Sequence, residues 1–590
     1  MGAFFLFKQD IEFNHYKVEK VFQNKGFKEK KTFQLRDYEL WLYSKQLLGY
    51  KNYFLIDPLD IEKGAVFAVG TLTYKGLDYE KSLELILKEF IAKRLNLYEI
   101  YGNYAIIFYK HGKIKILVDP MKVYSVFVNS EGSIFSSSFI AVSVADEERR
   151  KLNKIAIMEN ILTGLIIGGE TIFKNIRRIS NCEKAKVNNG VKILSSFNFD
   201  ESRVRIFKGN RCEAIHYQIE VIWDYLTKLN KLITISKIDI GLSGGYDSTL
   251  LFALLTNMKG IKDKLTVHTH WKNFVSIEEK VAFELVKVKN VKITHLPAPN
   301  IKKLSLEEFL KFIKDAFYFY DAQVRVNRDL FSYYRTREYR VRILGDDIKV
   351  ALSGEGGEKY RNYNYLRFKK MSLRDWLINK IITPLNYRGI LKNFQKKFVE
   401  HISQKIRSCL RISEEQSYVT LLQTKRYFAE IWFPYGVGVR NNAENQLVFF
   451  VSPFTEYIPT IESYKTIFHL GNGGEFESAM ISLIDKDISR VRSTYGFSFY
   501  RYPIYRKFTE FYRNLIPLKI RNILTPLISN RSTSIESELK IFSSEIEPFV
   551  KECFELIKDL GLPLEWKIIL CDRMNFLRAL SLGCILRFLD

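Results

Sequence analysis

The stretch "IGLSGGYDSTLLFALL", residues 240–255, combines an apolar lead, two glycines, an acid, hydroxyl residues and then a helical apolar pattern. A turn from a parallel strand into a helix gathers backbone N–H groups at the positive end of the helix dipole, which makes an anion site. Gly244 and Gly245 let that backbone approach a phosphate closely, and Ser243, Ser248 and Thr249 add hydroxyl donors. The stretch therefore predicts a phosphate-binding loop.

The acid in this loop decides what kind of phosphate site it is. A nucleotide-binding loop of the Walker type needs a lysine before its Ser or Thr, and this chain has Asp247 there. A carboxylate repels phosphate unless a cation such as Mg²⁺ lies between them. We expect a site for magnesium-bound pyrophosphate, in which ATP is split between its α and β phosphates. The plainer alternative is a glycine turn in an ordinary strand–helix unit.

Two motifs carry a resemblance to known proteins. "SGGYDS" matches the PP-loop signature SGGxDS of the ATP-pyrophosphatase superfamily, and "VALSGEGGEKY", residues 350–360, resembles the LSGEGxDE motif of asparagine synthetases. Glu358 and Lys359 stand where that family has Asp and then Glu. The resemblance implies that Asp247 and Glu358 bind Mg²⁺ and that Glu355 faces the reacting acyl group. It also implies the remaining contacts: Ser243, Gly244, Gly245 and Ser248 to pyrophosphate, and Leu242, Ser353 and Gly354 to adenosine.

Two later segments extend the resemblance. "VSPFTEYIPTIES", residues 451–463, is similar to the family's PFLD segment, with Thr455 and Glu456 where Leu and Asp are usual. "ISRVRSTYGFSF" is similar to its R-x-K-x-x-F segment, but Thr494 replaces the lysine that neutralises pyrophosphate or developing charge. Arg490 and Lys486 are the neighbouring basic residues that could substitute for it.

The N-terminal part also resembles this family. "GETIFKNIRRISNCEKAKVNNG" and "YGNYAIIFYKHGKIKILVDPMKVYSVFV" are similar to segments of its glutaminase-like domain. A glutaminase of this type needs a cysteine directly after the initiator Met, and this chain has Gly2 there. We therefore expect no glutaminase activity and a scaffold domain instead, as in the β-lactam synthetase and lasso-peptide cyclase branches.

The resemblance implies an α+β Ntn-hydrolase-like sandwich at residues 1–205. A doubly wound α/β PP-loop domain with helical additions (adenine nucleotide α-hydrolase-like) follows at residues 206–590. The implied function is an ATP- and Mg²⁺-dependent carbon–nitrogen ligase that adenylates a small-molecule or peptide carboxylate and passes it to ammonia or an amine. The alternatives are a catalytically silent scaffold protein and a PP-loop tRNA-modifying enzyme. A homodimer is left open.

The pattern of elements agrees with this division. Short β-branched and aromatic runs such as "GAVFAVGTL", "NYAIIFYK", "KIKILVD", "YSVFVN" and "SIFSSSFIAV" predict strands before about residue 200, with a helix at 79–93. A helix at about 211–231 comes next, followed by strands at 238–242, 265–270, 291–296 and 348–353 alternating with helices, which indicates a parallel sheet. From about 373 the pattern is mostly helical, with a polar interruption at 529–537.

Composition adds few constraints. The net charge of +25 comes from 91 basic and 66 acidic residues that are dispersed, so nucleic acid is a weaker expectation than a solvated basic surface. Six scattered cysteines form no CxxC pair, which favours a reducing compartment without disulfides. Without an apolar run of about 20 residues, we expect a cytoplasmic protein that does not span a membrane.

Three further features have ordinary interpretations. His268 and His270 are two apart on a strand, and a structural or nucleotide-edge role outweighs a metal pair because no third ligand is recognisable. The runs "AFYFYD" and "LFSYYRTREYRVR" interleave aromatic and basic residues, which favours helix packing on a pocket wall over a nucleic-acid surface.

Overall fold

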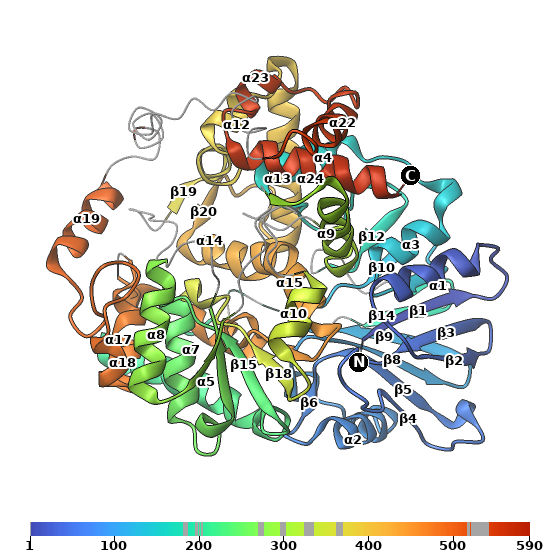
Figure 1. The fold of residues 1–590 in the computed structure, drawn as a ribbon, viewed down its shortest axis with the longest axis horizontal. Coiled ribbons are helices and arrows are strands. Elements are labelled where there is room, and N and C mark those ends of the chain that lie inside the picture. The colour runs from blue at the N-terminus through green and yellow to red at the C-terminus, as the bar shows by residue number, and fades with distance from the viewer. Residues whose placement is uncertain are drawn as a thin grey trace.

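The computed structural model describes residues 2–180, 187–194, 199, 201, 204–269, 276–295, 303–323, 336–361, 370–471, 473–515, 520 and 542–589. Within them, two six-stranded sheets lie in the N-terminal part and a five-stranded parallel sheet lies in the C-terminal part. Figure 1 shows these parts side by side, with the N-terminal sheets in blue to cyan and β15 and β18 of the parallel sheet in green to yellow-green.

The N-terminal sheets have the orders β12-β10-β11-β1-β3-β2 and β13-β14-β9-β8-β5-β4. The first contains β1 (Ala3–Lys8), β2 (Lys30–Leu35), β3 (Tyr38–Tyr43), β10 (Phe127–Asn129), β11 (Ile134–Ser136) and β12 (Ile176–Arg178). The second contains β4 (Tyr53–Leu55), β5 (Ala65–Gly70), β8 (Tyr104–Lys110), β9 (Lys113–Val118), β13 (Val187–Asn188) and β14 (Val191–Leu194). Pairing is antiparallel except between β9 and β14.

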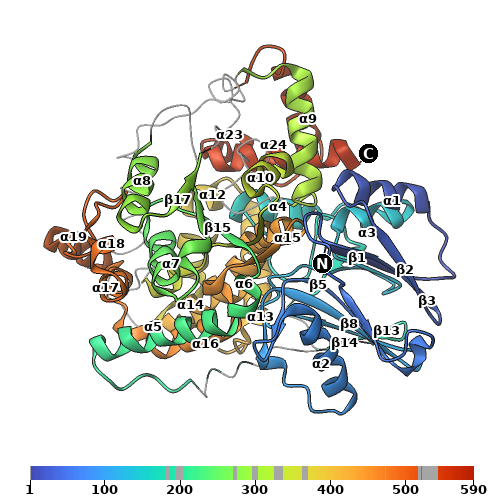
Figure 2. The ribbon, with the colours of Figure 1, turned by 60° about the horizontal axis from the view of Figure 1, so that its bottom comes forward.

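The two sheets stack face to face because successive side chains of a strand point to opposite faces. Phe4 and Leu6 of β1 join Phe67 of β5 in a core between the sheets. Phe5 and Phe7 point the other way and pack under α1 (His15–Asn24), α3 (Phe139–Ala145) and α4 (Lys154–Thr163). The outer face of the second sheet packs on α2 (Tyr79–Ile91). The result is a helix–sheet–sheet–helix sandwich, in which Figure 2 shows α2 below and α1 and α3 above.

The sequence prediction for this part is confirmed in outline and corrected at one place. The helix expected at 79–93 is α2, and the expected strands are present. Only Ile134–Ser136 of "SIFSSSFIAV" is a strand, however, because Ser138 caps a helix that begins at Phe139. The Ser138 side chain accepts the N–H of Ala141 at 3.3 Å, which satisfies one of the free donors at the helix start.

The parallel sheet has the order β17-β16-β15-β18-β21. Its strands are β15 (Lys237–Gly241), β16 (Leu265–His268), β17 (Lys292–Thr294), β18 (Ile348–Leu352) and β21 (Phe449–Val451). Four of them were expected from the sequence, and β21, which lies about a hundred residues beyond β18, was missed. The chain runs outward from β15 through β16 to β17 and then returns to place β18 on the other side of β15. The sheet therefore has a switch point between β15 and β18, where parallel sheets usually bind ligands.

Helices cover both faces of this sheet, which confirms the doubly wound prediction. Leu250 and Leu254 of α7 (Tyr246–Asn257) pack with Ile238 and Ile240 on one face. On the other face, Arg340 of α10 (Arg337–Leu344) contacts Asp239 of β15, and Glu444 of α15 (Gly438–Asn445) contacts Arg340 in turn. The helix expected at 211–231 is α5 (Arg211–Lys228) with the short α6 (Asn230–Ile233).

The C-terminal part is mostly helical, as expected. Its main helices are α13 (Lys392–Leu410), α14 (Leu421–Tyr427), the π-helix η10 (Phe428–Val437), α16 (Tyr457–Lys465), α17 (Glu475–Ile484), α18 (Lys486–Arg490), α19 (Ile504–Leu515), α22 (Glu547–Lys558) and α24 (Arg573–Leu589). The last helix returns to the N-terminal sandwich, where Arg578 donates to Ile161 O of α4 at 3.1 Å. Figure 1 shows α24 in red beside α4.

Some predictions fall outside the described residues, namely His270, the interruption at 529–537 and residues 330–335 of "LFSYYRTREYRVR". Where the structure describes the chain, no helix is long and apolar enough to cross a membrane. The expectation of no disulfide is wrong at one position, because Cys409 is disulfide-bonded. Cys212, Cys553, Cys571 and Cys584 carry thiols rather than disulfides.

Candidate active site

The first loop, residues 242–248, leads from β15 into α7 at the switch point. Gly244 has φ +72°, and a Cβ added there would lie 2.3 Å from Val281 Cγ1, so only glycine fits without strain. Ser243 N donates to Ser248 Oγ at 3.2 Å, and the two hydroxyls are 3.1 Å apart. Gly245 at the start of α7 supplies no side-chain cap. The N–H groups of the first turn therefore face the loop, as an anion site requires.

The second loop, residues 353–358, follows the neighbouring strand β18 and packs directly on the first. A Cβ on Gly354 would lie 2.6 Å from the carbonyl oxygen of Asp247, and one on Gly357 would lie 2.3 Å from its Oδ1. The two glycines thus allow the loops to meet at Asp247. From the sequence, only the family resemblance indicated that the two loops lie together. The structure shows their contact directly.

Asp247 and Glu358, the two expected magnesium ligands, belong to one acidic cluster. The pKa of Glu358 is raised to about 7, mainly by burial and also by the charge of Asp247, while Arg361 opposes the shift. Two carboxylates that repel each other in a half-buried place are a common arrangement around a divalent cation.

The structure adds two residues to this cluster that sequence reasoning missed. Arg361 Nη2 donates to Asp247 Oδ1 at 2.7 Å and Oδ2 at 2.9 Å, and it lies 4.0 Å from Glu358 Oε1. On its other side, Arg361 Nε lies 3.2 Å from Oε2 of Glu477, whose side chain is 0 % exposed. Burial raises the pKa of Glu477 well above its usual value, and the neighbouring carboxylates add to the shift. The one sequence signal for Glu477 is its position just after "GNGG", a glycine-rich turn into α17 like the other two loops.

The remaining predicted residues lie around the second loop. Glu355 Oε1 is 3.2 Å from Arg440 Nη1, and Ser353 Oγ accepts from both Glu355 N (3.2 Å) and Arg440 Nη1 (3.3 Å). Arg440 thus orients Glu355 and Ser353 together. The side chain of Leu242, which was expected to flank adenosine, is 2 % exposed and packs in the core. Only its backbone remains for ligand contact.

Thr494 also lies at the first loop. Its backbone N–H and its hydroxyl both donate to Gly244 O, at 3.2 and 3.3 Å. The next residue, Tyr495, stacks on Tyr246 with ring centroids 4.6 Å apart. The segment therefore covers the loop as expected but brings no positive charge to it. Arg490 and Lys486 do not fill the gap, since both are exposed and Arg490 pairs with Asp487 at the surface.

Comparison with known proteins places this site in a family. The family model described as Asparagine synthase matches residues 235–447, which include both loops, Arg361 and Arg440. This segment belongs to the asparagine synthase family. A solved glutamine-dependent NAD⁺ synthetase from Acinetobacter baumannii, in complex with ADP, is 12 % identical over 61 % of this chain and 76 % of that chain. The TM-score between the two structures is 0.19. No curated protein matches.

Beyond the asparagine synthase segment, Glu456 connects the site to the N-terminal sandwich. It accepts hydrogen bonds from Asn103 Nδ2 at 2.6 Å and from Gly102 N at 3.1 Å. It lies shortly after the end of β21. Burial raises the pKa of Glu456 to about 8. In the neighbouring loop, Lys359 is buried with its pKa well below the usual value because of desolvation and the charge of Lys425. Lys359 and Glu456, two of the positions that depart from the family pattern, are therefore buried.

At the N-terminus, Gly2 is packed too tightly for a larger residue. A Cβ added there would lie 2.5 Å from both Phe27 Cε1 and Ser44 O. Gly2 N also donates to Tyr43 O at 3.2 Å, which continues the β1–β3 ladder. A cysteine at this position would need the surrounding backbone to move.

His268 has the structural role that the sequence favoured. Its Nδ1 lies 2.7 Å from Asp239 Oδ1, and Arg340 joins Asp239 at 3.1 Å and Glu444 at 2.8 Å. All four side chains are buried, and they tie β15 and β16 to α10 and α15. The network stabilises the position of β15, the strand that leads into the first loop.

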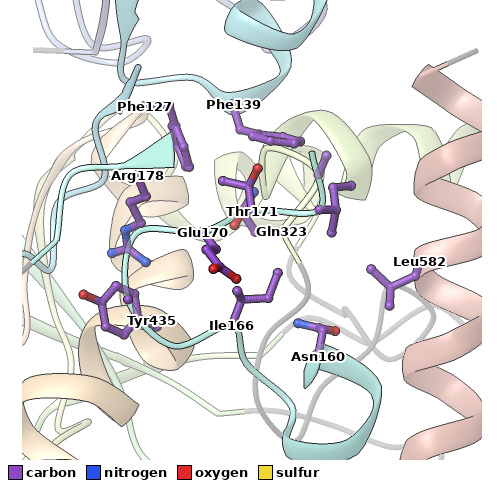
Figure 3. Close-up of a pocket in the computed structure, with 13 residues that line it drawn as sticks. Phe127, Phe139, Asn160, Ile166, Glu170, Thr171, Arg178, Gln323, Tyr435 and Leu582 are labelled. Atoms are coloured by element: carbon purple, nitrogen blue, oxygen red, sulfur yellow. The ribbon is translucent and has the colours of Figure 1, made fainter. Parts of the chain in front are cut away.

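A separate cavity lies between the sandwich and the helical part, and none of the loop residues lines it. Figure 3 shows Glu170, Arg178 and Tyr435 on one side of it and Asn160 and Leu582 on another. Arg178 donates to Lys122 O (3.0 Å) and Pro434 O (2.8 Å), so its charge already holds two backbone segments together. This cavity is therefore separate from the site that the two glycine loops form.

Proposed function

We propose that this chain is an ATP-dependent ligase that forms amide bonds. A carboxylate oxygen of the substrate attacks the α phosphorus of ATP, the α–β anhydride bond breaks, and pyrophosphate leaves. A nitrogen nucleophile then attacks the acyl carbon, loses a proton and displaces AMP. The observation that carries this proposal is the meeting of two glycine loops at Asp247, at the switch point of a parallel sheet in an asparagine synthase segment.

In this proposal, the first loop and the start of α7 hold pyrophosphate through Ser243, Gly244, Gly245 and Ser248. Ser353, Gly354 and the Leu242 backbone flank adenosine, and Glu355 faces the acyl group. The position of Glu355 beside Arg440 supports this assignment, because the guanidinium fixes the orientation of that side chain.

Mg²⁺ fits the donor set of this site. Asp247, Glu358 and Glu477 bring three carboxyl groups to one place. Among the described residues, Arg361 forms ion pairs with all three. Carboxylate oxygens are the ligands that Mg²⁺ prefers, and it is usually bound by one or two of them together with substrate phosphates. We propose Asp247 and Glu358 as these ligands. The ion would supply charge neutralisation for the phosphates.

The nitrogen source is proposed to be ammonia or an amine rather than glutamine hydrolysed by this chain. The tight packing at Gly2 and its missing side chain support this view. The sandwich at residues 1–205 is then an Ntn-hydrolase-like domain that serves as a scaffold for the synthetase domain at 206–590. The layer order of its helices and sheets supports the assignment.

The test is release of AMP and pyrophosphate from ATP and Mg²⁺ with a panel of carboxylic acids, each with ammonia, an amine or glutamine. We expect turnover with ammonia or an amine and no glutamate from glutamine. Asp247→Asn should abolish turnover, whereas Asp347→Asn, the same change at a 70 % exposed side chain, should not. Absence of Mg·ATP binding by calorimetry would overturn the proposal and favour a silent scaffold. Salt-sensitive tRNA binding would favour the tRNA-modifying alternative.

A further inference from the structure

Arg361 lies at the start of α7, where a positive charge needs an anionic partner to be stable. Its guanidinium lies against Asp247 in the first turn of α7, at the positive end of the helix dipole. A cation there is repelled by the dipole and by the N–H groups around it unless an anion shares the place. Asp247 is that anion in the structure, and both of its oxygens accept from Arg361 Nη2.

Glu477 fixes Arg361 in this position from behind. Its completely buried carboxylate contacts Nε at 3.2 Å, and the guanidinium also lies 5.2 Å from the centre of the Tyr246 ring. Burying such a carboxylate is unfavourable unless a cationic partner compensates for its lost hydration. Glu477 and Tyr246 thus hold Arg361 through Nε and the face of the guanidinium, while Nη2 points at the loop.

The positions that could have neutralised pyrophosphate bring no positive charge to the first loop. Thr494, which covers Gly244, is neutral, and Arg490 and Lys486 are exposed. Arg440, the other buried guanidinium of the site, is taken up by Glu355 and by Glu444. Within the described part of the chain, Arg361 is the basic side chain that ion-pairs with the first loop.

We propose that Arg361 is a pyrophosphate-binding residue of this site, an inference that rests on the proposed ligase function. With magnesium and ATP bound, Asp247 would ligate the cation, and the Nη groups of Arg361 would donate to the β and γ phosphate oxygens instead. Glu477 keeps Nε in place during this exchange. The fork of a guanidinium suits two oxygens of one phosphate, so its charge stabilises the departing pyrophosphate.

The test is calorimetric binding of two probes, magnesium pyrophosphate and AMP, to the full chain. We expect Arg361→Met to weaken pyrophosphate binding by about tenfold or more, the usual value of one charge-assisted hydrogen bond, with AMP binding unchanged. Adding Thr494→Lys to Arg361→Met should restore part of the loss, because a lysine there would lie beside Gly244. Arg490→Met is the matched control and should change neither affinity.

Removing Arg361 leaves Glu477 without its partner, so the double variant Arg361→Met/Glu477→Gln keeps the comparison valid if the single variant does not fold. It should lose pyrophosphate affinity to the same extent. Equal pyrophosphate affinity in the wild type and these variants would overturn the inference and leave the ligase proposal standing. Parallel losses for AMP and pyrophosphate would overturn it too, since they would mean a structural role. A wild type that binds neither probe would defeat both proposals.

Discussion

Glu456 accepts a hydrogen bond from Asn103 Nδ2 at 2.6 Å, which joins the segment after β21 to the start of β8. The contact crosses from the C-terminal sheet to the N-terminal sandwich. Burial raises the pKa of Glu456 to about 8, and the charge of Asp119 adds to the shift. Glu456 is therefore mostly protonated at neutral pH, and its role in joining the two parts depends on pH.

The first prediction concerns this pH dependence. Because the folded pKa lies above the unfolded value of 4.5, folding takes up a proton between these values. The stability that this provides is present below about pH 4.5 and is lost as pH rises through about 8. Thermal midpoints between pH 5 and 9 should fall more steeply for the wild type than for Glu456→Gln. Glu307→Gln, on the exposed surface of α9 (Leu306–Phe319), should keep the wild-type slope.

The second prediction concerns Gly357. Its Cβ in Gly357→Ala would lie 2.3 Å from Asp247 Oδ1, so the carboxylate must move. We expect Mg·ATP affinity to fall by about tenfold or more, with the thermal midpoint changing little, because the strain is confined to one loop. Gly49→Ala, where a Cβ meets nothing within 4 Å, is the matched control. Unchanged affinity in Gly357→Ala would contradict the placement of the cation at Asp247.

The third prediction concerns Gly2. Gly2→Cys should not create a glutaminase, because its side chain collides with Phe27 and the backbone at Ser44. Overpacking of this kind costs roughly 1–3 kcal/mol. We expect a lower thermal midpoint and no glutamate release from glutamine, whereas Gly49→Cys should leave the midpoint unchanged. Glutamate release by the variant would show that a functional pocket surrounds Gly2.

The fourth prediction concerns the network under the sheet. Arg340→Met leaves Asp239 and Glu444 buried without their shared partner, which costs about 3–5 kcal/mol. Urea unfolding should show this loss. Lys237→Met, at an exposed pair with Asp347, should cost less than about 1 kcal/mol. If the two variants were equally stable, the buried network would not be what holds β15.

The sequence by itself determined the local features of this protein. Period-two alternation and glycine turns predicted most strands, and the strand–helix alternation after residue 237 predicted the parallel sheet. The types and order of Ser243, Gly244, Gly245 and Asp247 predicted the loop, because its conformation depends on residues that are neighbours in the chain. The helix at Phe139 was missed because its apolar residues fit a strand equally well.

Only the tertiary structure decided which distant residues share the site. Arg361 and Glu477 are more than a hundred residues apart, and they meet at Asp247 because η8 (Gly357–Tyr360) and α17 both pack near the start of α7. The addition of β21 beside β18, the burial of Leu242 and the partner of His268 were settled in the same way. Such contacts depend on how whole elements pack around a sheet. A short sequence pattern indicates the periodicity of one element but not which other elements it packs against.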